Sequence, residues 1–280
     1  MFGVILASIG AFFEELSCTI GKREVKRKEE SVYAMGFLNA LWGILFFGIL
    51  IVFFRDIGTM TLYSWRTFLI RVCLSIVQAY LTVNAIAKAD RSTFGFIRTG
   101  TIPLLLVGDI FFGTYISAYQ ILGMVIISIG LLYLYKNHGF SKKGTLFVVF
   151  STINAAITIG LYKYNISHGN SVELEQGLGL IALLGFFYFM CRIRTSERPL
   201  KLLRNTMLAL QSGSVGVASV VESFAYVLAP ASIVIAATRS STVIFSVISG
   251  SVYFHEKRIS IKIISLIAFV VGIILLGVDR

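Results

Sequence analysis

SVYAMGFLNALWGILFFGILIVFF, residues 31–54, contains 24 consecutive residues without a charged side chain. Residues 110–135 and 144–162 form two further uncharged runs, of 26 and 19 residues. The hydrocarbon core of a bilayer is about 30 Å thick, and an α-helix needs roughly 20 residues to cross it at about 1.5 Å per residue. Each run is therefore long enough to form a membrane-spanning helix, and together they indicate a chain that crosses a membrane several times.

The rest of the chain repeats this pattern, with apolar residues making up 56% of the sequence and a mean hydropathy of +0.84. The stretch 205–238 is too long for one span, and Pro230 is the natural break within it. We therefore predict an all-α integral membrane protein with ten transmembrane helices, near residues 2–20, 32–54, 67–87, 92–112, 115–135, 144–162, 174–191, 205–228, 231–254 and 260–278.

The positive charge of the chain is distributed unevenly over the loops between these spans. The formal net charge is +11, and 18 of the 25 Lys and Arg residues fall in loops that lie on one face of the predicted bundle, against 5 on the other. Cytoplasmic loops of membrane proteins carry this excess for insertion reasons alone, so the bilayer, and not nucleic acid, is the expected partner. We place the basic face in the cytoplasm and both termini outside, in a multi-pass protein of the cell (inner) membrane.

Two halves of the chain, residues 1–137 and 138–280, look like related five-helix repeats. An odd number of spans gives the two halves opposite topologies, and their loop charges reverse accordingly: the loop after the first span is basic, whereas the loop after the sixth is not. Residues 97–101 (IRTGT) also align with residues 238–242 (TRSST) at an offset of 141. We therefore predict two inverted repeats, an arrangement that places a transporter's binding site near the membrane midplane.

Three segments resemble the EamA-like ten-helix proteins of the drug/metabolite transporter superfamily. They are Ala237–Ser241, Tyr253–Arg258 and Gly272–Leu276, which follow that family's order of a small-residue helix, a Gly-Glu-Arg-like turn and a glycine-containing last helix. His255 stands where the family has glycine, and the corresponding turn of the first half, Gly113–Tyr115, has no acid. The resemblance implies a solute carrier without naming the solute.

Ionisable side chains within the spans are the first candidates for a substrate site, because each costs a few kcal/mol at the centre of a bilayer and normally faces a bundle interior or a water-filled cavity. Those deep in the spans are Glu14, Glu15, Arg98, Asp109, Glu222 and Arg239. Arg71 and Lys262 lie near helix ends, where we expect their side chains to snorkel to the interface.

The first span contains two adjacent acids, Glu14 and Glu15, whose side chains point about 100° apart on a helix. Gly10, Ala11, Glu15 and Thr19 are similar to the first helix of the small multidrug resistance transporters, a four-helix branch of the same superfamily, in which the glutamate exchanges protons against a cation. That resemblance favours Glu15 as the proton-linked residue. The alternative is that both acids lie at the interface.

The remaining candidates are arginines, a Glu–Tyr pair and polar amides. Arg98 and Arg239 occupy matching places in the two halves and could bind a carboxylate or phosphate, or neutralise the buried glutamates. Glu222 and Tyr226 are one helical turn apart and could line a cavity together. Candidate polar contacts deep in spans, each of which could equally be interhelical glue, are Asn39, Gln78, Asn84 and Asn154.

These patterns predict a secondary transporter of a small metabolite, of amino-acid or nucleotide/sugar type, that works by alternating access. A proton-coupled exporter of lipophilic cations is the alternative, with Phe12, Phe13, Trp42 and Tyr226 as candidate aromatic contacts. A membrane-embedded enzyme would need clustered metal ligands, but the three Cys and three His residues are scattered, so we expect no catalysis, metal or cofactor. The expected partners are a small-molecule substrate and protons, and both a monomer and a homodimer stay open.

Overall fold

The computed structural model describes residues 1–25, 31–54, 59–61, 64–88, 97–136, 144–195, 197–254 and 259–278, and its regular structure over these residues is entirely helical. The α-helices are α1 (Phe2–Val25), α2 (Val32–Phe54), α3 (Trp65–Lys88), α5 (Thr101–Phe111), α6 (Ala118–Lys136), α7 (Thr145–Ser167), α8 (Val172–Met190), α9 (Thr206–Leu228), α10 (Ala231–Phe254) and α11 (Ile259–Leu276). Two short helices connect α8 to α9: the π-helix η2 (Cys191–Thr195) and the 3₁₀-helix η3 (Pro199–Arg204).

The prediction of an all-helical chain is confirmed for the described residues, and the length and composition of several helices are compatible with a multi-pass membrane protein. Among the residues that the structure describes, five segments are long and apolar enough to cross a membrane: Phe2–Ile20, Val32–Phe53, Thr145–Ser167, Val172–Thr195 and Thr206–Leu228. The exposed surface is rich in large apolar side chains, such as Val52 (77% exposed), Phe53 (78%) and Phe111 (82%). Charged groups such as Arg71 and Glu175 are buried instead. An outer surface with many large apolar side chains and charged groups held inside is the distribution that lipid favours.

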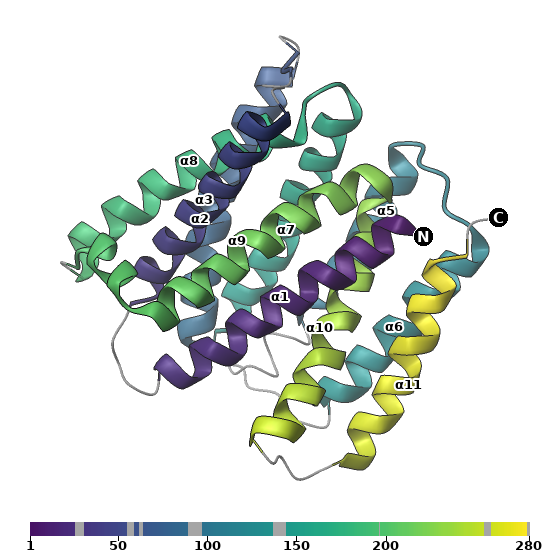
Figure 1. Ribbon diagram of the computed structural model, residues 1–280. Helices are drawn as coiled ribbons and strands as arrows, with labels where there is room; N and C mark the ends of the chain where they lie inside the picture. Colours follow the sequence, from purple (N-terminus) through teal and green to yellow (C-terminus); the bar gives the residue numbers. More distant parts are fainter. Residues whose placement is uncertain are drawn as a thin grey trace.

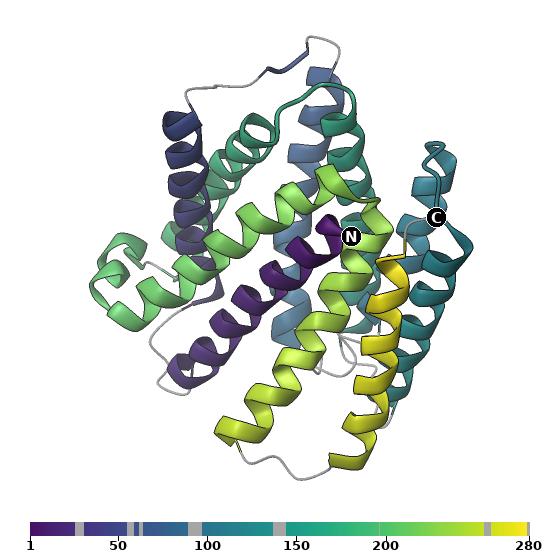
Figure 2. The same cartoon turned by 45° about the vertical axis from the view of Figure 1, so that its right-hand side comes forward.

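The helices form one bundle with two edges and a set of helices between them (Figures 1 and 2). At one edge of the bundle α2 lies against α8, and at the opposite edge α6 lies against α11. Between these edges α1 packs on α9 and α10, α3 packs on α7, and α5 packs on α7 and α10. In addition, α2 contacts α9, and α3 contacts α8.

Small residues allow α1 to approach α9 closely. Ala7, Ala11 and Ala225 are completely buried, and Gly10 faces α9. A Cβ atom on Gly10 would lie 3.5 Å from both the Ala218 carbonyl oxygen and the Glu222 Cβ atom. Close approach of this kind is how membrane helices gain van der Waals contact without a hydrophobic driving force. It also brings the middle of α1, which carries Glu14, near Glu222.

Glycines with positive φ follow the C-termini of α5 and α7. Gly113 (φ 73°) ends α5 in a Schellman motif, in which the Gly113 N–H donates to the Ile110 carbonyl (3.0 Å) and the Thr114 N–H donates to the Asp109 carbonyl (2.9 Å). Gly169 (φ 99°) reverses the chain between α7 and α8. Residues with a side chain rarely adopt such positive φ angles, so these two turns are encoded by their glycines.

The break between α9 and α10 falls at Pro230, as the sequence predicts. The residue before a proline avoids helical geometry, and Ala229 is extended (φ −148°, ψ 158°), so the last carbonyls of α9 need other donors. Lys163 of α7 donates its Nζ to the Tyr226 carbonyl at 2.5 Å. Asp109 of α5 accepts the first N–H groups of α10, from Ala231 (3.3 Å) and Ser232 (2.7 Å). Two charged side chains therefore satisfy the backbone at this break.

Candidate functional site

A cavity of about 360 Å³ lies among α1, α3, α7, α8, α9, α10 and the segment that precedes α5. This volume falls within the range of roughly 300–1,000 Å³ that is typical of small-molecule sites. The charged side chains and the tyrosines that line it are Glu14, Arg71, Arg98, Tyr162, Glu222, Tyr226 and Arg239. Segments far apart in the sequence thus meet around one space that charged and apolar side chains line together.

Helices α9 and α10 supply the largest share of these groups. Glu222 and Tyr226 lie one turn apart on α9, and the Tyr226 hydroxyl lies 3.4 Å from Glu222 Oε1, to which it donates. The Tyr226 ring packs edge-on against Tyr162 of α7, with 5.6 Å between ring centroids. The Tyr162 hydroxyl donates to the Ser223 carbonyl at 3.2 Å, which fixes the position of α7 against this part of α9.

The two matching arginines of the predicted repeats, Arg98 and Arg239, both line the cavity. They face it together with the carboxylates of Glu14 and Glu222. Guanidinium groups can bind a carboxylate or phosphate through paired hydrogen bonds, whereas carboxylates bind amines or protons. The cavity therefore offers partners for both signs of charge on a solute.

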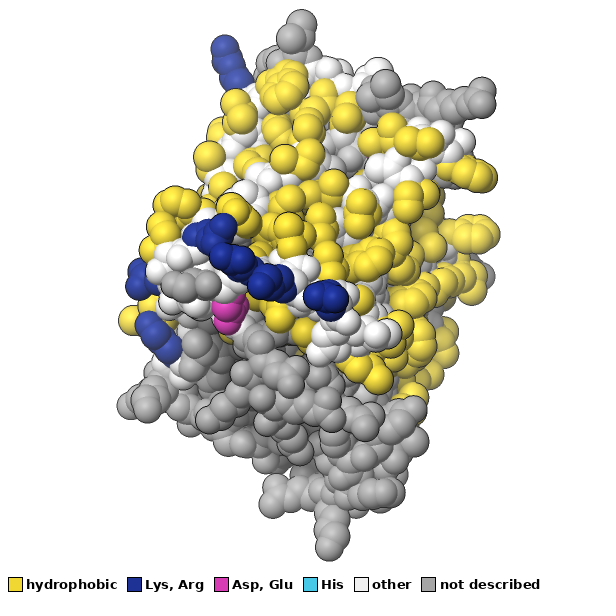
Figure 3. Space-filling model, turned by 60° about the vertical axis from the view of Figure 1, so that its left-hand side comes forward, with side chains coloured by type: hydrophobic (Ala, Val, Ile, Leu, Met, Phe, Trp, Pro, Cys, Tyr) yellow, Lys and Arg dark blue, Asp and Glu magenta, His cyan; other side chains and the backbone are white. Residues whose placement is uncertain are grey.

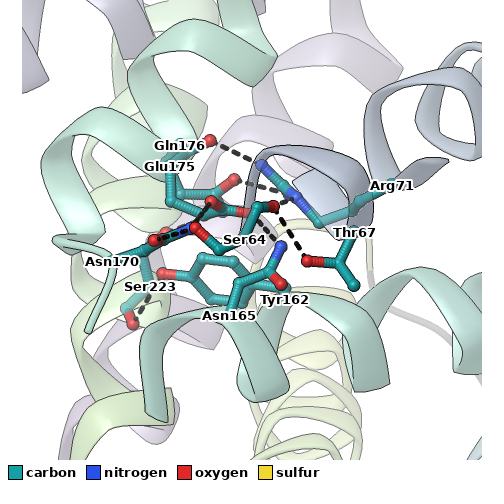
Figure 4. Close-up of polar contacts among 9 residues, drawn as sticks. All are labelled: Ser64, Thr67, Arg71, Tyr162, Asn165, Asn170, Glu175, Gln176 and Ser223. Carbon is teal, nitrogen blue, oxygen red and sulfur yellow. Dashed lines mark hydrogen bonds and ion pairs between the residues drawn. The ribbon is translucent and has the colours of Figure 1, made fainter. Parts of the chain in front are cut away.

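Arg71 does not snorkel to the interface, so that expectation is wrong. Its side chain is 6% exposed, and its Nε lies 2.8 Å from Oε1 of Glu175, which is fully buried on α8 (Figure 4). Arg71 also donates to the Glu175 carbonyl (2.5 Å) and to Gln176 Oε1 (3.2 Å). Burying two paired charges costs less free energy than burying either charge alone in a low-dielectric interior. The Glu175 carboxylate therefore stabilises the Arg71 guanidinium inside the bundle.

Glu175 is satisfied on both oxygens by the end of α7 and the turn that follows it. The Asn165 side chain donates to Oε1 at 2.8 Å, and the Asn170 side chain donates to Oε2 at 2.7 Å (Figure 4). Ser64, just before α3, donates to the Asn170 amide oxygen at 2.5 Å. Both carboxylate oxygens of Glu175 are thus hydrogen-bonded, and a buried polar network of this kind rigidifies the elements that carry it.

The network joins three helix ends to the cavity wall. The Ser171 N–H donates to the Thr59 carbonyl at 2.9 Å, which ties the segment before α3 to the start of α8. Gln176, which lines the cavity, donates to the Ser223 hydroxyl of α9 at 3.0 Å. Arg71 and Gln176 therefore belong both to the cavity lining and to the network.

The structure separates the two adjacent acids of α1. Glu14 lines the cavity, whereas Glu15 is not among the lining residues and accepts a hydrogen bond from Thr19 at 3.3 Å. The family resemblance favoured Glu15, but Glu14 is the acid that lines the cavity.

The four amide candidates lie away from the cavity lining. Asn154 of α7 donates to Gln78 of α3 at 2.9 Å, and Gln78 donates to Ser151 at 2.9 Å, so this pair joins two helices. Asn84 donates to the Tyr80 carbonyl of its own helix at 2.9 Å. Asn39 lies on α2, and its buried Oδ1 accepts no hydrogen bond in the part of the chain that the structure describes.

Sequence reasoning missed Glu175, Gln176 and Tyr162. A signal was present for the ion pair, because Arg71 and Glu175 each lie within two turns of the start of a predicted span on the same face of the membrane. Opposite charges at similar depth on helices that can pack together predict a pair. The turn motif of the family resemblance, Tyr253–Arg258, falls largely outside the described residues, as do most of the basic loop residues 22–28.

Comparison with known proteins gives the fold alone. No family model matches the chain, and no curated protein matches it. A solved structure described only as "Crystal structure of protein" is similar, with a TM-score of 0.77 and 13% sequence identity over 99% of this chain and 98% of that chain. The whole length of the chain is therefore one known arrangement of helices.

Proposed function

We propose that this protein is a secondary transporter of a small polar metabolite, related to the EamA-like drug/metabolite transporters, and that it works by alternating access. The observation that carries the proposal is the polar cavity of about 360 Å³, lined by Glu14, Glu222, Arg98 and Arg239, inside a bundle with an apolar surface. A substrate of mixed or single charge would bind there against the complementary side chains.

The cost of these charges supports a water-filled path over a structural role. A charged side chain at the centre of a bilayer costs about 2.5–3.5 kcal/mol on insertion scales. A scaffold without transport would gain stability by closing this space, as happens between α6 and α11, where Gly123 and Gly130 allow the last helix to approach closely. A solute that binds to these charged side chains would explain why they line an open space.

The packing of the helices supports the proposed ten-span, two-repeat plan. Pairing the halves in order matches α1 with α7, α2 with α8, α3 with α9, α5 with α10 and α6 with α11. If each helix is replaced by its match in the other half, the α1–α9 contact becomes α7–α3 and the α1–α10 contact becomes α7–α5. In the same way, α2–α9 becomes α8–α3. All of these contacts occur. The pairs α2–α8, α5–α10 and α6–α11 map onto themselves and also occur. An approximate two-fold relation between the halves would account for these contacts.

The lining favours a polar metabolite over a lipophilic cation. Of the four candidate aromatic contacts for the cation-exporter alternative, Tyr226 lines the cavity, whereas Phe12, Phe13 and Trp42 are not among the lining residues. Phe12 instead packs edge-on against Phe245, with 5.4 Å between ring centroids, on the outer side of α1. A cavity edged by arginines and glutamates suits hydrogen-bonding solutes.

The proposal is tested by flux in proteoliposomes with an imposed pH gradient, using labelled amino acids, nucleotides and quaternary amines as probes. We expect flux of a polar probe that Glu14→Gln reduces at least tenfold. Glu15→Gln is the matched control, since it removes the same charge from the adjacent position, and it should retain flux. Absence of flux for every probe in the wild-type protein would count against transport, and equal loss in both variants would remove Glu14 from the path.

A further inference from the structure

The connection between α8 and α9 carries five cations, four of them in the short helices η2 and η3. Arg192 and Arg194 lie in η2, Arg198 precedes η3, and Lys201 and Arg204 lie in η3; all five side chains are exposed. Figure 3 shows Lys and Arg side chains gathered along the border of an apolar face, on the side of the molecule where α8 ends and α9 begins.

Local contacts fix this segment. The Glu197 N–H donates to the Cys191 carbonyl at 3.3 Å, and the Thr195 hydroxyl donates to the same carbonyl at 3.0 Å. Cys191 and Pro199, the first residues of η2 and η3, are buried. Ser31, at the start of α2, donates to Glu197 Oε2 at 2.5 Å. The one described acid of the segment is therefore engaged, and within the described residues no ion pair joins any of the five cations to a carboxylate.

Exposed apolar side chains accompany the cations. Phe189 (61% exposed), Ile193 (60%) and Leu200 (57%) protrude from the end of α8 and from the two short helices. Arg192 lies over the Tyr188 ring, 5.6 Å from its centroid. Apolar groups next to cations and an aromatic ring are the composition of a segment that lies at the boundary between acyl chains and headgroups.

We propose that this connection binds the phosphate groups of anionic phospholipids on the basic face of the membrane. Insertion bias alone explains the presence of Lys and Arg in a loop, but it requires neither two short helices nor protruding apolar residues. Here Phe189, Ile193 and Leu200 enter the acyl region and hold the backbone at headgroup depth, where the unpaired guanidinium and ammonium groups meet lipid phosphates.

The test is lipid binding to the purified full-length protein, measured by native mass spectrometry and by titration with phosphatidylglycerol or phosphatidylcholine in mixed micelles. We expect phosphatidylglycerol to bind at least tenfold more tightly than phosphatidylcholine. The triple variant Arg194→Gln/Arg198→Gln/Lys201→Gln should lose at least tenfold in that affinity, because each such cation contributes about fivefold. Arg194→Lys/Arg198→Lys, which keeps the charge, should bind as the wild type does.

The matched control is Lys136→Gln/Lys142→Gln/Lys143→Gln, which removes three charges from another loop of the same predicted face. It should bind phosphatidylglycerol within twofold of the wild type. Equal loss in the control would mean that diffuse charge, and not this connection, attracts the lipid. Retention of affinity in the triple variant, or displacement of the lipid by millimolar inorganic phosphate, would overturn the proposal. If the triple variant does not fold, the single variants Arg198→Gln and Lys201→Gln test the proposal in its place. Each should lose about fivefold in affinity for phosphatidylglycerol, and unchanged affinity in both would overturn the proposal.

Discussion

Lys163→Met removes the donor that satisfies the end of α9. The Lys163 Nζ donates to the Tyr226 carbonyl at 2.5 Å, at a helix end where the residue before Pro230 has left helical geometry. Methionine has a similar length and fills the same space without a donor. The change therefore isolates the hydrogen bond and the charge from the packing of the side chain.

The expected cost has two parts. A hydrogen bond to a charged group contributes about 1.5–3 kcal/mol, and a buried carbonyl left without a donor costs about 1–3 kcal/mol. These figures overlap, because both describe the same lost contact, so we expect Lys163→Met to lower the free energy of unfolding by about 2–3 kcal/mol. Lys163→Arg keeps a charged donor and should cost less than half as much.

The assay is equilibrium unfolding in mixed micelles, followed by circular dichroism. Lys201→Met is the control, because Lys201 is exposed on η3 and its loss should change the free energy of unfolding by less than about 0.5 kcal/mol. The reasoning is refuted if Lys163→Met unfolds within about 0.5 kcal/mol of the wild type. It is also refuted if Lys163→Arg and Lys163→Met lose the same stability.

Three further predictions concern the packing around the cavity. Arg71→Met leaves Glu175 buried without its partner and should lower the free energy of unfolding by about 3–5 kcal/mol. The double variant Arg71→Met/Glu175→Met should lose less stability than the single variant. A double variant that is the least stable would contradict the ion-pair account. Gly10→Ala should keep flux and stability, because the new Cβ atom lies in ordinary contact at 3.5 Å, while Gly10→Leu should separate α1 from α9 and cost about 1–3 kcal/mol; equal behaviour of the two would argue against close packing there. Gln78→Leu should cost about 0.5–2 kcal/mol and leave proteoliposome flux unchanged, since Gln78 joins α3 to α7 away from the cavity; loss of flux at wild-type stability would assign it to the path.

The bounds of α2 and the end of α9 could be predicted from the sequence because an uncharged run and a proline are local signals. Pro230 marks the end of α9, and the predicted segment 32–54 coincides with α2. Whether a helix contacts lipid or another helix depends on rotation about its axis, which is not a local property. For that reason the sequence could not decide between Glu14 and Glu15, which differ by about 100° on the same helix.

The misjudged residue was Arg71, and the reason is physical. Position near a helix end predicts snorkelling only when no buried partner exists, and the partner, Glu175, belongs to a helix about 100 residues further along the chain. Glu175 itself lies in the first turn of α8, where an acid is favourable on local grounds. The burial of Arg71 therefore depends on the tertiary contact between α3 and α8 and could not be predicted from either segment alone.

The most direct test of the central claim is the accessibility of the cavity from each side of the membrane. Ser75 of α3 lines the cavity, so Ser75→Cys, in a chain whose Cys18, Cys73 and Cys191 are replaced by serine, places one thiol in the path. Ser212→Cys, on the buried face of α9 and outside the cavity lining, is the control. A membrane-impermeant maleimide should label Ser75→Cys from either side of sealed, oriented vesicles and should not label Ser212→Cys. A cavity thiol that is labelled from neither side, or from one side only under every gradient imposed, would contradict alternating access.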